Sequence, residues 1–76
     1  MSQKNKVVVV TGASSGIGKE TARLYLKKGY VLILNGKSAK KLEEFYNNEN
    51  IDVVSGDIAS EDVQSKIREL VEKKRG

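Results

Sequence analysis

The sequence TGASSGIG at Thr11–Gly18 decides the fold, because it joins a short apolar run to a stretch with helical periodicity. Before it, Val7 to Val10 are four consecutive β-branched residues, a pattern typical of a strand buried on both faces. After it, Gly16 to Lys28 carries apolar residues at helical spacing, and Gly29 is a natural C-terminal stop. We therefore predict that this glycine-rich segment is the turn between a buried strand and a helix.

The strand and helix pattern occurs three times along the chain. Val31 to Leu34 is predicted to be a second buried strand, and Ile51 to Val54 a third. Ser38 is a suitable N-cap for a second helix that runs to about Asn47, and Ser60 for a third. Strands that alternate with helices imply right-handed crossovers and a parallel sheet. The predicted fold class is α/β, with a three-stranded parallel sheet and three helices in the order βαβαβα.

Length and composition exclude several classes of function. The 76 residues are expected to form one small domain, residues 1–76. The chain has no Cys and no His, so we expect no metal site and no catalytic triad built on either residue. The net charge of +4 comes with only one Phe and three Tyr. A nucleic-acid-binding protein is expected to combine basic charge with more aromatic residues for stacking, so the composition does not favour that function. No apolar run is long enough to span a bilayer, and the lack of Cys fits a cytoplasmic protein.

Each glycine of the turn has a separate physical role. Gly12 allows the chain to turn sharply out of the strand. Gly16 permits close approach to the helix N-terminus, where unpaired N–H groups and the helix dipole attract a pyrophosphate. Gly18 has no side chain to hold the helix away from the sheet. The alternative is a glycine-rich turn that binds no ligand.

The pattern Thr-Gly-x-x-x-Gly-x-Gly at Thr11–Gly18 resembles the cofactor loop of the short-chain dehydrogenase/reductase family. The resemblance continues at Gly29, which matches the glycine that ends the first helix in that family. Gly56-Asp57-Ile58 is similar to the family's Asp-aliphatic pair, which contacts adenine. All 76 residues align with the N-terminal third of the family, which implies the first half of a Rossmann fold and a partial dinucleotide-binding domain.

The resemblance also implies a choice of cofactor. Gly36 occupies the position where NAD-binding members carry an acidic residue, and Lys37 follows it. A missing carboxylate and an added ammonium favour a ribose 2′-phosphate, and hence NADP over NAD. The resemblance assigns cofactor binding to nine residues: Gly12, Ser14, Ser15, Gly16, Ile17, Gly18, Lys37, Asp57 and Ile58. For Lys37 the alternative is a solvated loop lysine, and for Asp57 a residue that caps nearby N–H groups of a turn.

The catalytic residues of the family are not found in this sequence. Members use a Tyr-x-x-x-Lys couple, in which the tyrosine is the general acid/base, together with a Ser and an Asn. Here Tyr25, Tyr30 and Tyr46 are followed four positions later by Gly, Leu and Asn. The resemblance therefore predicts an NADP(H)-binding N-terminal fragment of an oxidoreductase that has no dehydrogenase activity alone and no catalytic residue.

Two other interpretations follow from the same residues. In the full Rossmann fold the strand order is 3-2-1-4-5-6, so the strand at Val7–Val10 is central there but lies at an edge here. Because its residues form strands strongly and carry no charge, we predict a homodimer in which two copies pair along this edge. The chain is alternatively a stand-alone small α/β module that binds another phosphate ligand, or an assembly module without redox chemistry.

Overall fold

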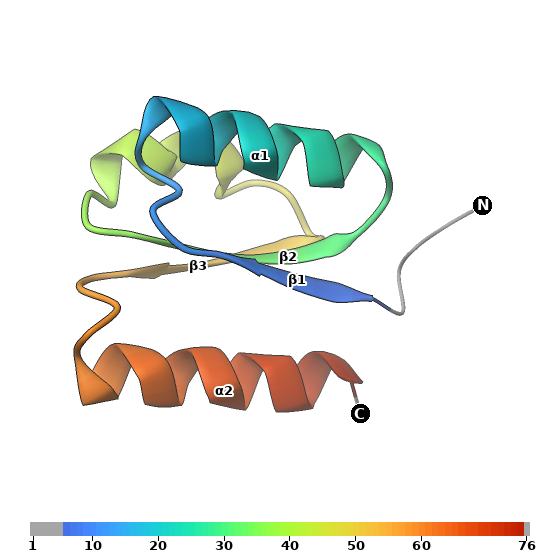
Figure 1. The fold of residues 1–76 in the computed structure, drawn as a ribbon. Helices are drawn as coiled ribbons and strands as arrows, with labels where there is room; N and C mark the ends of the chain where they lie inside the picture. The colour runs from blue at the N-terminus through green and yellow to red at the C-terminus, as the bar shows by residue number, and fades with distance from the viewer. Residues whose placement is uncertain (1–5, 76) are drawn as a thin grey trace.

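A computed structural model describes residues 6–75 of the chain (Figure 1). Strands and helices alternate along it, and the second of the three helices is a short 3₁₀ helix, η1. In chain order the elements are β1 (Val7–Val10), α1 (Gly16–Lys27), β2 (Val31–Gly36), η1 (Lys40–Phe45), β3 (Ile51–Ser55) and α2 (Glu61–Arg75). None of the helices in this described range is both long and apolar enough to cross a membrane.

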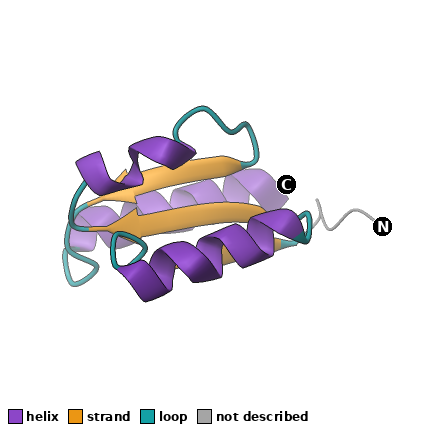
Figure 2. Cartoon of the chain, turned by 90° about the horizontal axis from the view of Figure 1, so that it is seen from above, coloured by secondary structure: helices purple, strands orange, loops and turns teal. Residues whose placement is uncertain are grey.

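The three strands form one parallel sheet in the order β1-β2-β3. Val9 is opposite Ile33 of the central strand, and Leu34 of that strand is opposite Val53. The helices α1 and η1 cover one face of the sheet, and α2 covers the other (Figure 1). Figure 2 shows α1 and η1 side by side over the same face. The predicted α/β class with a three-stranded parallel sheet is confirmed.

The central strand β2 supplies the core on both faces of the sheet. Leu32 and Leu34 point to the side of α1 and η1, where they pack with Ala22 and Leu42. Ile33 points to the opposite side, where it packs with Val54 of β3 and Ile67 of α2. All three β2 side chains are fully buried, as expected for a strand with an uninterrupted apolar run.

The second predicted helix is wrong in type and in length. It is the six-residue 3₁₀ helix η1, Lys40–Phe45, rather than an α-helix that Ser38 caps and that runs to about Asn47. The Ser38 hydroxyl does accept a hydrogen bond from the Lys41 N–H, at 3.3 Å. Only two side chains of η1 are buried, Leu42 and Phe45, and their spacing of three matches the three residues per turn of a 3₁₀ helix.

Strand β2 is longer than predicted, and this extension reaches the site. It continues beyond Leu34 through Asn35 and Gly36, which lie opposite Val54 and Ser55 of β3. Both added residues are buried. The other side of the sheet ends at β1, which pairs only with β2 among the described residues.

Candidate functional site

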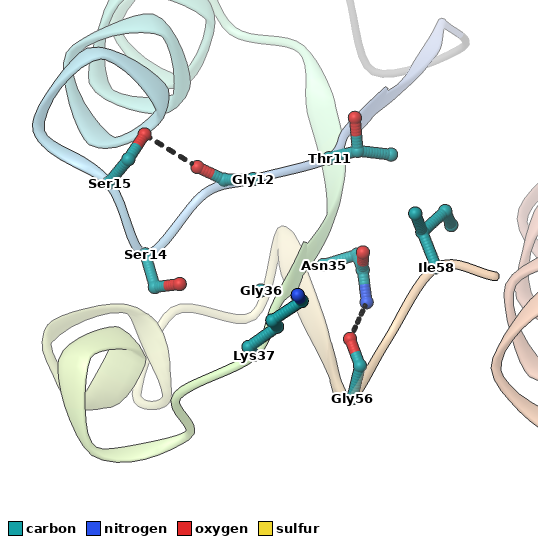
Figure 3. A pocket seen from close by; sticks show the side chains of 9 residues that line it. All are labelled: Thr11, Gly12, Ser14, Ser15, Asn35, Gly36, Lys37, Gly56 and Ile58. Carbon is teal, nitrogen blue, oxygen red and sulfur yellow. Dashed lines mark hydrogen bonds between the residues drawn. The ribbon is translucent and has the colours of Figure 1, made fainter. Parts of the chain in front are cut away.

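The turn between β1 and α1 is held in shape by its own hydrogen bonds. Gly12 has a φ of 66°, a left-handed conformation that favours glycine, and its carbonyl oxygen accepts the Ser15 N–H at 3.1 Å. The Ser15 hydroxyl accepts the Gly18 N–H at 3.1 Å and donates to the Gly12 carbonyl at 2.9 Å (Figure 3). Ser15 is therefore the N-cap of α1, and its hydroxyl is already engaged within the protein.

Two glycines of this turn lie in opposite environments. A Cβ on Gly18 would overlap the Gly12 carbonyl oxygen and lie 2.8 Å from the Ala13 Cα. Gly18 thus allows α1 to begin this close to the turn that precedes it. A Cβ on Gly16 would meet nothing within 4 Å, so the backbone at the start of α1 borders open space. Space above a helix N-terminus is the arrangement that admits an anion.

A cavity of about 240 Å³ lies where the strands end, beside this turn. In an open parallel sheet, ligands bind at the carboxyl ends of the strands, which is where this cavity lies. Its walls come from the β1–α1 turn, the end of β2 and the β3–α2 turn (Figure 3). It is lined by Thr11, Gly12, Ser14, Ser15, Asn35, Gly36, Lys37, Gly56 and Ile58.

The structure brings together five of the nine residues expected to bind a cofactor. These five line the cavity: Gly12, Ser14, Ser15, Lys37 and Ile58. Gly16 and Gly18 lie in the first turn of α1, and the Ile17 side chain between them is 84% exposed. The Asp57 carboxylate accepts the Ala59 N–H at 2.9 Å, which is the turn-capping alternative considered for it. The binding roles of all nine residues stay predictions.

Four further residues line the cavity that were not among the nine predicted to bind a cofactor: Thr11, Asn35, Gly36 and Gly56. Thr11 and Gly56 are the residues that follow β1 and β3, and Asn35 lies one residue before the end of β2. A polar residue next to an apolar run of strand was the available signal for Asn35. It was missed because the strand was predicted to end at Leu34.

The end of β2 touches the glycine turn closely at Gly36. A Cβ on Gly36 would lie 2.7 Å from the Ser14 hydroxyl oxygen and 2.9 Å from the Ser14 nitrogen. Next to this contact, the Ala13 N–H donates to the Asn35 carbonyl oxygen at 2.8 Å. Glycine is therefore the one residue type at position 36 that lets β2 and the turn approach this closely without a shift of either.

The charge at the cavity is positive. Lys37 lines the cavity, is exposed, and forms no salt bridge within residues 6–75. Among the described residues that line the cavity there is no Asp or Glu. A cavity bordered by the glycine turn, with one ammonium group among its lining residues, suits a phosphate-bearing ligand.

Comparison with known proteins agrees with this geometry. The family model described as short chain dehydrogenase matches residues 6–76, almost the whole chain. The chain belongs to the short-chain dehydrogenase family. Members of this family bind a nicotinamide dinucleotide, and a cavity beside the glycine turn with Lys37 in its wall fits a ligand of that kind.

Several similar proteins show how much of a short-chain dehydrogenase this chain covers. An uncharacterized oxidoreductase of Listeria monocytogenes is 54% identical over 44 residues, which are 58% of this chain and 18% of the relative. Glucose dehydrogenase of Caenorhabditis elegans, solved in the apo form, superposes with a TM-score of 0.84 at 28% identity. The match covers all of this chain and 35% of the dehydrogenase.

A second solved structure from Caenorhabditis elegans is a short-chain dehydrogenase/reductase of unknown function with its cofactor. It has a TM-score of 0.82 and 32% identity, and the match covers 97% of this chain and 30% of that protein. The chain thus spans about a third of the length of the solved short-chain dehydrogenases that it matches.

Proposed function

We propose that this chain is the NADP(H)-binding segment of a short-chain dehydrogenase, and that it reads the 2′-phosphate of the cofactor. The observation that carries the proposal is Lys37, which is exposed, lines the cavity directly after Gly36 and has no salt bridge within residues 6–75. No carboxylate occurs between Leu34 and Lys41, so nothing there repels a phosphate or receives the ribose hydroxyls of NAD.

Each wall of the cavity has a separate task in this proposal. The N–H groups at the start of α1 receive the pyrophosphate, and the space above Gly16 lets it approach. Lys37 pairs with the 2′-phosphate, and Ser14 offers a hydroxyl to the ribose and phosphate oxygens. Ile58 packs against adenine from the β3–α2 turn. The bound cofactor supplies hydride chemistry, while these residues bind and orient it.

We also propose that the chain does not catalyse the redox step alone. Each of its three tyrosines makes a structural contact, and none is followed by the lysine of a Tyr-x-x-x-Lys couple. The Tyr25 and Tyr30 rings pack edge to face with centroids 5.2 Å apart, and both lie against the core. The Tyr46 hydroxyl donates to the Ala39 carbonyl oxygen at 3.1 Å. None of the three lines the cavity.

Titration of the folded chain with NADPH, NADH and ATP tests the cofactor proposal. We expect NADPH to bind more tightly than NADH, and Gly16→Val to abolish binding because the new side chain fills the ligand's space. Lys37→Asp is expected to remove the preference for NADPH. Lys73→Asp is the matched control. Lys73 is exposed on α2, so its substitution makes the same change in net charge away from the cavity.

Two results would contradict the proposal in different ways. If ATP binds as tightly as NADPH, the alternative of a general phosphate-binding module is favoured. If Lys37→Asp and Lys73→Asp have the same effect, Lys37 does not read the 2′-phosphate. Turnover of a carbonyl compound by the purified chain with NADPH would overturn the proposal of catalytic incompleteness.

We further propose that two copies of the chain associate through β1, in the cytoplasm. The edge of β1 that faces away from β2 has no strand partner within residues 6–75. The strand consists of four valines, so it has neither a charged residue nor a proline to discourage pairing with another strand. A two-fold axis beside β1 would join the two sheets into one of six strands.

A further inference from the structure

Asn35 is the one buried polar residue in the part of the chain that the structure describes, with 2% of its surface exposed. It lies near the end of β2, where a continuous apolar strand would otherwise continue. A buried amide is retained at low cost only when its hydrogen bonds are made. The partners of Asn35 therefore show what it does.

Asn35 is hydrogen-bonded to both turns that form the cavity together with the end of β2. Its side-chain Nδ2 donates to the Val54 carbonyl oxygen at 2.9 Å and to the Gly56 carbonyl oxygen at 3.1 Å. Its own backbone carbonyl accepts the Ala13 N–H of the glycine turn at 2.8 Å. Because both side-chain partners are carbonyls, the amide nitrogen must face them, and the amide oxygen points away from Gly56 (Figure 3).

The turn that Asn35 holds is one that the backbone does not adopt readily. Gly56 has a φ of 131°, and a Cβ there would lie 2.8 Å from Val63 Cγ2. Its N–H donates to the Gly36 carbonyl at 2.9 Å, so β2 holds Gly56 through both its N–H and its carbonyl. Ile58 follows two residues later and lines the cavity.

We propose that Asn35 is a positioning residue that sets the distance between the glycine turn and the β3–α2 turn, and thereby the width of the adenosine side of the cavity. This inference rests on the proposed function for its choice of ligand. One amide donor pair fixes the β3–α2 turn, while the Asn35 backbone fixes the glycine turn. A leucine at this position has a similar branched shape but no amide, and it would leave the Gly56 carbonyl without its side-chain donor.

Hydrogen exchange in the ligand-free chain tests the positioning role without any nucleotide. We expect Asn35→Leu to speed exchange of the Gly56, Ala59 and Ser60 amides by about tenfold more than the amides of β1, because the turn opens locally. Asn35→Thr keeps one donor and is expected to give a smaller effect. Phe45→Leu is the control, since it weakens the core on the opposite face of the sheet.

Adenosine 2′,5′-bisphosphate and NADPH serve as ligand probes on the same variants. Asn35→Leu is expected to weaken both by about tenfold, and Asn35→Thr to restore part of the affinity, while Phe45→Leu changes neither by more than about twofold. Equal exchange at the turn in Asn35→Leu and Phe45→Leu would overturn the positioning role. If the wild-type chain binds neither probe, the proposed function fails, and the exchange result still judges Asn35 alone.

Discussion

Arg23 of α1 binds the carboxylate of Glu44 in η1, and its Nη2 donates to both carboxylate oxygens at 2.9 Å. Its Nε donates to the same carboxylate at 3.3 Å, and Lys19 Nζ lies 3.4 Å from it. This fork joins two helices on one face of the sheet, and η1 follows directly after the segment that carries Lys37. A six-residue 3₁₀ helix has few hydrogen bonds of its own, so its position depends on such contacts.

The Arg23–Glu44 pair predicts a stability that falls in acid. The hydrogen bond from Arg23 lowers the pKa of Glu44 below its usual value of 4.5, against the opposing effect of desolvation. A carboxyl with a depressed pKa in the folded state stabilises the fold above its unfolded pKa and loses that contribution as the pH falls through the folded value. We expect the free energy of unfolding to depend less on pH below about 4.5 in Glu44→Gln than in the wild type.

Glu43→Gln is the matched control for this pH dependence. Glu43 is the neighbouring residue of η1, is exposed, and has no salt bridge within residues 6–75. Chemical denaturation at a series of pH values measures both variants. The same pH profile in the two variants would show that the fork onto Glu44 contributes nothing in solution, as is common for exposed pairs.

Gly18 and Gly16 predict opposite effects of the same substitution. Gly18→Ala is expected to destabilise the fold by about 1–3 kcal/mol or more, because its Cβ would overlap backbone atoms of the turn. Gly16→Ala is expected to be neutral or to stabilise by up to about 1 kcal/mol, since its Cβ meets open space and alanine favours helix. Urea denaturation measures both, and a loss of stability in Gly16→Ala that matches Gly18→Ala would contradict the geometry.

An acidic residue at position 36 is expected to disturb the site rather than to convert it to NAD. Any side chain at Gly36 must displace Ser14, whose hydroxyl oxygen would lie 2.7 Å from the new Cβ. We expect Gly36→Asp to weaken binding of both NADPH and NADH, whereas Lys37→Asp weakens NADPH selectively. Gly36→Ala separates charge from bulk, because it brings the same contact without a carboxylate. Tight NADH binding by Gly36→Asp would show that the turn adapts.

The sequence predicted the strands and the glycine turn because each carries a local signal. Four valines form β1, and the fixed spacing of Gly12, Gly16 and Gly18 follows at once. The true extent of β2 was not predictable in this way, since Asn35 and Gly36 resemble the end of a strand. They continue the strand because Val54 and Ser55 of β3 lie opposite them, a contact between segments far apart in the chain.

The type of η1 and the role of Asn35 depend on the same kind of distant contact. Leu42 and Phe45 fit an α-helix or a 3₁₀ helix equally well by sequence, and packing against β2 and β3 decides between them. The partners of the Asn35 amide lie 19 and 21 residues further along the chain. No local sequence pattern predicts contacts over such separations, so the part of the cavity formed by the β3–α2 turn was found only in the structure.

The proposed homodimer predicts that a charge on β1 separates the two copies. Val9 lies in this strand and is 40% exposed, and a lysine there places an ammonium beside the edge at which the second copy would pair. We expect sedimentation equilibrium over a range of concentrations to show dimers of the wild type and monomers of Val9→Lys. Leu24→Lys is the control, because Leu24 is 52% exposed on α1 and away from the strand. A dimer that survives Val9→Lys but is lost in Leu24→Lys would place the interface on the helix, and a monomeric wild type would remove the proposal altogether.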